Sequence, residues 1–131
     1  AYAQSKLAMT LYGVELARKF EGSGRRSLIA HPGVSNTDIV GRHYGRLLGK
    51  MLMPLVNLYG ISGPKEGASS IIYAIREEGI PNGSYIGPQG KKEWRGSPGH
   101  CQLSDKALDE ELARQLWQFS EELTGDRFII D

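Results

Sequence analysis

The chain has 131 residues, of which 40% are hydrophobic and 24% charged, with a formal net charge of +1. This length suits one globular domain with a buried core, and the near-neutral charge gives no general attraction to nucleic acid or to an anionic membrane. The single cysteine, Cys101, excludes an intrachain disulfide and favours a reducing, cytoplasmic compartment. Glycine, lysine and proline interrupt the most apolar stretch, 47–61, so it is not expected to span a membrane.

The first two predicted elements are a helix over residues 2–20 and a strand over 27–31. Apolar residues recur at helical spacing up to the glycine-rich breaker at 22–24. The next run, Ser-Leu-Ile-Ala-His, is almost continuously apolar, as expected for a strand covered on both faces. Pro32 and Gly33 then end the strand.

The middle of the chain is less regular. Residues 34–63 lack a sustained period, although one or two short helices are expected at about 45–59. Pro64 is suited to the first position of a further helix, which Gly79 is expected to end.

The last third begins with a predicted strand at 84–87, followed by a surface loop at 89–102 that is rich in Gly, Lys and Pro. A final helix, capped by Ser104 or Asp105, is expected to end at Gly125. Its predicted apolar stripe consists of Leu108, Leu112, Leu116, Phe119 and Leu123.

This order of elements predicts an α/β fold. Strands separated by helices pair in parallel, with the helices covering the faces of the sheet. Two short parallel strands make a poor sheet by themselves, however, because parallel sheets need more neighbours and cover on both sides. We therefore expect residues 1–131 to be part of a domain.

Tyr2 and Lys6 are candidate catalytic residues. Residues four apart lie on the same face of a helix, so their side chains can meet. A neighbouring cation favours the phenolate form of a tyrosine. Such a tyrosine can donate a proton to a carbonyl oxygen as hydride arrives, or remove one from an alcohol in the reverse direction. The pair alone is a weak motif, because a Tyr and a Lys at this spacing are common on helix surfaces.

A second motif follows the first predicted strand. In His-Pro-Gly-Val-Ser-Asn-Thr-Asp, residues 31–38, Pro32 and Gly33 favour a turn at the carboxyl end of a parallel strand. This is where α/β sheets bind ligands.

Together, Tyr-x-x-x-Lys in Ala-Tyr-Ala-Gln-Ser-Lys-Leu-Ala and Pro-Gly-x-x-x-Thr at residues 32–37 resemble the short-chain dehydrogenase/reductase family. The motif His-Pro-Gly-x-x-x-Thr, together with Val-Glu-Leu-Ala at 14–17, most resembles the sequences of the branch that contains retinol-dehydrogenase-like and related bacterial oxidoreductases. The resemblance covers nearly the whole chain. It implies the C-terminal half of one Rossmann-type, doubly wound NAD(P)-binding domain.

The resemblance also implies site residues and a reaction. Tyr2 would be the general acid/base, and Lys6 would favour its phenolate and bind the nicotinamide ribose. Pro32, Gly33, Val34 and Thr37 would position the nicotinamide of NAD or NADP. The implied activity is hydride transfer between a carbonyl and an alcohol, in a protein expected to be a homo-oligomer.

The chain departs from the family pattern in what it lacks. The glycine-rich phosphate-binding turn, the residue that selects NAD or NADP, the Asn-Ala-Gly segment and the catalytic Ser all precede the Tyr in the family, whereas only Ala1 precedes Tyr2 here. We therefore expect Ala1 to mark a truncation within a longer protein, and the isolated chain to be inactive.

Three alternatives stay open. The chain could be a non-catalytic remnant that self-associates through its exposed strand edge. It could also be the C-terminal piece of a split enzyme. A short-chain-family epimerase fits less well, because no larger substrate domain follows.

The remaining candidates are a substrate segment and a metal site. Residues 38–63 occupy the family's variable substrate flap, and their apolar content suggests either an apolar small-molecule substrate or plain packing. The histidines show no metal-ligand spacing with one another or with Cys101, so no metal is expected. The adjacent His100 and Cys101 are interpreted as an incidental pair, and both tryptophans as packing residues.

Overall fold

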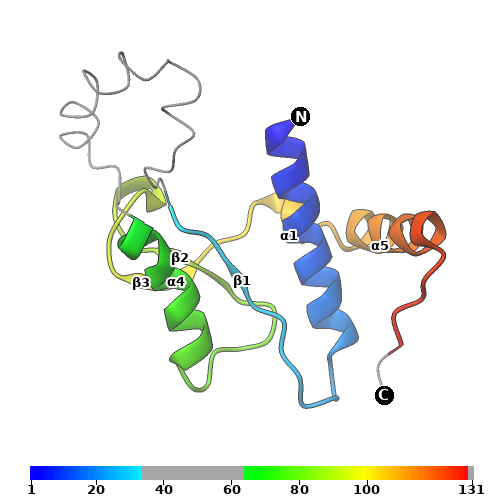
Figure 1. Ribbon diagram of the computed structural model, residues 1–131, viewed down its shortest axis with the longest axis horizontal. Coiled ribbons are helices and arrows are strands. Elements are labelled where there is room, and N and C mark those ends of the chain that lie inside the picture. Colours follow the sequence, from blue (N-terminus) through cyan, green and yellow to red (C-terminus); the bar gives the residue numbers. More distant parts are fainter. Residues whose placement is uncertain (34–63, 130–131) are drawn as a thin grey trace. The chain divides into compact units, whose positions relative to one another are not determined.

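The computed structural model describes residues 1–33 and 64–129, which form helices and short strands (Figure 1). These residues fall into two compact units: unit 1 contains 1–29, 79–85 and 102–129, and unit 2 contains 30–33, 64–78 and 86–101. In chain order the elements are α1 (Tyr2–Lys19), β1 (Ile29–Ala30), α4 (Pro64–Arg76), β2 (Tyr85–Pro88), the 3₁₀ turn η1 (Lys91–Glu93), β3 (Pro98–Cys101), the 3₁₀ turn η2 (Asp105–Leu108) and α5 (Glu110–Thr124).

The three strands form one mixed sheet in the order β1–β2–β3. β1 and β2 run parallel, since the N–H of Ile29 donates to the carbonyl of Ser84 and that of His31 to Ile86, both at 2.9 Å. Gln89 follows β2 and Ser97 precedes β3. The N–H of Gln89 donates to the carbonyl of Ser97 at 2.9 Å, which closes the hairpin between the two strands. The predicted α/β class with parallel pairing is confirmed.

The prediction of a plain surface loop at 89–102 is wrong, because this stretch holds η1 and β3. Its glycines permit the hairpin instead of excluding a strand. A Cβ on Gly90 would overlap the carbonyl oxygen of Arg95, and Gly96 has a φ of +131° that side-chain-bearing residues rarely adopt. Glycine therefore allows the two arms of the hairpin to approach closely.

Unit 1 is built on the packing of α1 against α5 and η2. In Figure 1, α5 lies beside α1 with its axis at a steep angle to that of α1. Leu11 and Ala17 of α1 and Ala113 and Trp117 of α5 are each no more than 6% exposed. The predicted helix at 2–20 is thus confirmed as α1, and Trp117 is the packing residue that the sequence predicts.

The register of α5 differs from the prediction. Asp109 caps the helix by accepting a 2.9 Å hydrogen bond from the N–H of Leu112, whereas Ser104 and Asp105 begin the preceding turn η2. The helix buries Ala113 and Trp117 and leaves much of the predicted stripe exposed. Exposures of 40% or more are found at Leu108, Leu112, Phe119 and Leu123.

Asn82 ties three segments of unit 1 together. Its side-chain oxygen accepts from the N–H of Ser27 at 2.8 Å, and its amide nitrogen donates to the carbonyl of Ala17 at 2.6 Å. The N–H of Gly83 also donates to the carbonyl of Ser27 at 2.9 Å. The Asn-Gly turn at residues 82–83 therefore fixes the end of α1 to the segment that leads into β1.

In unit 2, α4 packs against β3. Ile86 of β2 is fully buried, and Ser70 and Ala74 of α4 are 1% and 8% exposed. The helix predicted from Pro64 and the strand predicted at 84–87 are both confirmed as α4 and β2, and Gly79 follows α4 with a φ of +82°. Among the described residues, no helix is long and apolar enough to cross a membrane.

Candidate functional site

Tyr2 and Lys6 lie together on the first turns of α1, as their spacing predicts. The Lys6 ammonium is 5.6 Å from the centroid of the Tyr2 ring, and the Tyr2 side chain is 72% exposed. The Lys6 ammonium also lies 3.9 Å from the sulfur of Met9. Both reactive groups are therefore open to a ligand approaching this end of the helix in unit 1.

The Pro32–Gly33 turn follows β1 directly, at the carboxyl end of the parallel β1–β2 pair in unit 2. Gly33 has a φ of +70°, and a Cβ there would lie 2.5 Å from the carbonyl oxygen of Trp94 and 2.7 Å from the ring of Pro88. Only glycine fits this position without displacing the backbone of 93–94. Pro32 remains exposed at the turn.

His31 is fixed beside this turn from two sides. The N–H of Gly33 donates to its Nδ1 at 3.3 Å, and its Nε2 is 3.4 Å from a carboxylate oxygen of Glu93. Gly87 of β2 makes room for the ring, since a Cβ there would overlap the imidazole. Partial burial lowers the pKa of His31, and the nearby carboxylate of Glu93 opposes that shift.

Cys101, at the end of β3, completes a cluster with His31 and Glu93. Their ligand atoms all lie within 4.8 Å of one another. Burial raises the pKa of the Cys101 thiol, and Glu93 raises it further by its charge and by accepting a hydrogen bond. Sequence spacing missed this cluster because its three members come from separate segments that only the fold brings together.

The predicted site residues fall in two different units or lie outside the described residues. Val34 and Thr37 lie outside the described residues, as does the expected substrate segment 38–63. Tyr2 and Lys6 belong to unit 1, whereas Pro32 and Gly33 belong to unit 2. The side chain of His100 is exposed.

Comparison with known proteins finds relatives over nearly the whole chain. Human retinol dehydrogenase 14 is 38% identical over 128 residues, which are 95% of this chain and 35% of that protein. Dehydrogenase/reductase SDR family member 13 of Bos taurus is 34% identical over 130 residues, 95% of this chain and 31% of that protein. No protein-family model matches the chain.

A solved structure agrees with these relatives. The crystal structure of an uncharacterised protein from Mycobacterium paratuberculosis matches with a TM-score of 0.71 and 30% identity, over 99% of this chain and 40% of that one. The chain thus spans about a third of the length of the curated relatives it matches.

Proposed function

We propose that this chain belongs to the short-chain dehydrogenase/reductase family and that it carries the proton-transfer residues of an NAD(P)-dependent oxidoreductase. The proposed reaction interconverts a carbonyl and an alcohol. The observation that supports it most directly is the exposed pair of Tyr2 and Lys6 on one face of α1.

In this proposal the Tyr2 hydroxyl is the general acid/base. In the reductive direction it gives its proton to the substrate oxygen, and in the oxidative direction its phenolate takes the alcohol proton. Lys6, one helical turn away, places a positive charge beside the Tyr2 ring. The open position of both groups supports these roles, because a general acid or base must reach the atom to which it gives a proton or from which it takes one.

The nicotinamide cofactor would supply or accept the hydride. Pro32 and Gly33, with Val34 and Thr37, would hold its nicotinamide end, and Lys6 would bind its ribose. The close packing of the Gly33 backbone against Pro88 and Trp94 supports this assignment, because a turn held in one shape can present its backbone groups to a ligand.

The proposed substrate is an apolar carbonyl or alcohol. Retinol dehydrogenase 14 is named for such an alcohol, and residues 38–63 of this chain are rich in large apolar and aromatic side chains suited to one. Among them are Tyr44, Leu47, Leu48, Met51, Leu52, Met53 and Leu55. We also propose that the active protein is a homo-oligomer.

Replacement of Tyr2 by phenylalanine tests the proposal in the complete protein. We expect kcat to fall by about a hundredfold or more, since the proton donor is lost, while the Kd for NAD(P)H changes little. Tyr2 is largely exposed, so the fold should be unaffected.

Tyr12→Phe is the matched control, because Tyr12 lies on the same helix but stacks on Trp117 at 4.3 Å between ring centroids. This variant should keep its turnover. Normal turnover by the Tyr2 variant would remove Tyr2 from the acid/base role.

A further inference from the structure

Three side chains with different ligand chemistry meet in unit 2, and the proposed oxidoreductase reaction uses none of them as a base or nucleophile. His31 follows β1, Glu93 ends η1 and Cys101 ends β3. One nitrogen, one oxygen and one sulfur ligand atom lie within 4.8 Å of one another. Each of the three residues is partly buried.

The backbone holds these groups at a conformational cost. Lys92 and Glu93 have φ angles of 58° and 56°, in the left-handed region that side-chain-bearing residues avoid. The turn nevertheless brings the Glu93 carboxylate to 3.4 Å from His31 Nε2.

Gly87 contributes to the same arrangement from β2. A side chain at this position would occupy the space of the His31 imidazole. The ring therefore sits over the bare backbone of β2, close to the end of β3. The segment after β1, the turn η1 and the strand β3 thus each contribute one ligand atom to the cluster.

We propose that His31, Glu93 and Cys101 bind one divalent cation of the zinc type. Zn²⁺ takes imidazole nitrogen, carboxylate oxygen and thiolate sulfur at about 2.0–2.3 Å in a tetrahedral arrangement. Such bonds place ligand atoms about 3.3–3.8 Å apart, so the cluster needs to contract only by about 1 Å from its widest separation. The Glu93 side chain, 42% exposed, has the freedom to make that movement.

The ligand set also defines which cations should bind. A thiolate and an imidazole favour Zn²⁺ and Co²⁺, whereas Mg²⁺ and Ca²⁺ prefer oxygen ligands alone. Three protein ligands leave the fourth tetrahedral position to water or an external ligand.

Binding has a proton balance. The thiol proton of Cys101 is released to solvent, and His31 must present an unprotonated Nε2 to the ion. In the neutral imidazole the remaining proton then lies on Nδ1, which cannot accept from the N–H of Gly33. Since that contact is long, at 3.3 Å, its loss is a small cost. The Gly33 amide thereby becomes a reporter of occupancy.

Titration of the metal-free protein with Zn²⁺ and, separately, with Co²⁺ tests the site. We expect one ion per chain, a thiolate-to-Co²⁺ charge-transfer band in the near ultraviolet, a shift of the Gly33 amide resonance, and no binding of Mg²⁺. Cys101→Ser should abolish the band. It should weaken Zn²⁺ binding by more than the roughly tenfold to hundredfold that loss of an outer-shell partner costs.

Two further variants make the test decisive. Glu93→Gln alters an exposed side chain, so it should keep the metal-free fold and still weaken Zn²⁺ binding. His100→Gln, the matched control, changes an exposed histidine next to Cys101 and should bind Zn²⁺ as the parent does. Absence of the charge-transfer band in the parent would overturn the proposal. So would unchanged Zn²⁺ affinity in Glu93→Gln, or an equal loss in His100→Gln.

Discussion

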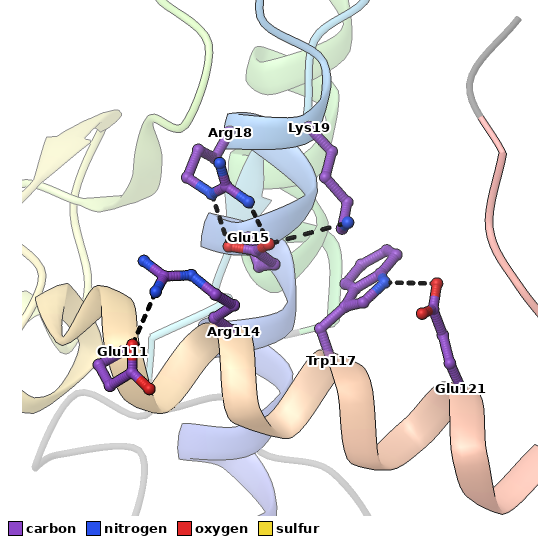
Figure 2. A network of polar contacts seen from close by, with 7 residues as sticks. All are labelled: Glu15, Arg18, Lys19, Glu111, Arg114, Trp117 and Glu121. Atoms are coloured by element: carbon purple, nitrogen blue, oxygen red, sulfur yellow. Dashed lines mark hydrogen bonds and ion pairs between the residues drawn. The ribbon is translucent and has the colours of Figure 1, made fainter.

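The carboxylate of Glu15 is buried on α1, where only 2% of its side chain is exposed, and two cations of the same helix bind it. Arg18 donates two hydrogen bonds, at 2.9 Å from Nε and 2.7 Å from Nη2, and the Lys19 ammonium lies 3.9 Å away (Figure 2). The hydrogen bonds from Arg18 lower the pKa of Glu15, and burial opposes the shift. The contacts with Arg18 and Lys19 therefore favour the ionised carboxylate of Glu15 in the folded state.

Glu15→Gln should lower the free energy of unfolding by about 1–2 kcal/mol at neutral pH, a value reduced because the Arg18 side chain is 45% exposed. A carboxyl whose pKa is lowered by folding stabilises the protein above its unfolded pKa, about 4.3 for Glu. The difference between parent and variant should hence be full at pH 7 and shrink as the pH falls below about 4. Urea titrations at a series of pH values measure it.

Glu111→Gln is the control for this prediction. Glu111 and Arg114 form the same kind of pair three residues apart, at 2.7 Å, but their side chains are 62% and 45% exposed. Removing an exposed pair should change stability by less than about 0.5 kcal/mol. Equal losses in the two variants, or a loss at Glu15 that is independent of pH, would contradict the role assigned to burial.

At the scale of elements, the contact between α1 and α5 centres on Trp117. Its ring stacks on Tyr12 at 4.3 Å and meets Phe128 edge-on at 5.5 Å, and its indole N–H donates to Glu121 at 2.8 Å. The Lys19 ammonium lies 4.9 Å from the same ring. One side chain thus joins two helices and the segment that follows α5.

Trp117→Ala should destabilise the protein by about 3–5 kcal/mol, the usual cost of removing a buried large aromatic side chain. Trp94→Ala should cost less than about 1 kcal/mol, because the Trp94 side chain is 46% exposed. Denaturation followed by far-ultraviolet circular dichroism compares the two without relying on tryptophan fluorescence. Similar losses would show that Trp117 does not hold the helices together.

The elements differ in how much of them the sequence could predict. α1 and α4 follow from local apolar spacing and from Pro64, so their existence needs no tertiary information. β3 could not be predicted, because its Pro-Gly-His-Cys sequence has no strand pattern and is ordered by its pairing with β2. The sequence also predicts the wrong buried face for α5, since leucine spacing marks an apolar stripe but does not show that the helix packs through Ala113 and Trp117.

At the scale of the whole molecule, the candidate sites also differ in whether local sequence or tertiary pairing brings their residues together. Tyr2 and Lys6 lie within one helical turn, so their spacing alone predicts that they meet. His31, Glu93 and Cys101 approach one another only through the pairing of β1, β2 and β3 and the left-handed turn at Lys92. No local pattern contains that information.

The 131-residue chain by itself should show no saturable binding of NADH or NADPH. These residues contain no glycine-rich turn of the kind that binds the dinucleotide phosphates, and the curated relatives are about three times as long. Fluorescence titration of the reduced cofactors against the isolated chain measures this. Saturation at micromolar concentration would refute the proposed inactivity, and the complete protein serves as the positive control.

The bonds made by Asn82 have a consequence for the chemical ageing of the protein. An Asn-Gly pair deamidates when the backbone nitrogen of the glycine attacks the asparagine side-chain carbonyl. Here the Gly83 N–H is engaged by the carbonyl of Ser27, and both ends of the Asn82 side-chain amide are held by other segments. These hydrogen bonds restrain both reacting groups in the folded protein. Deamidation would replace the Asn82 amide by a carboxylate, which has no proton to donate to the Ala17 carbonyl. We therefore expect the folded protein to deamidate more slowly at Asn82 than the unfolded chain, and deamidation to weaken unit 1.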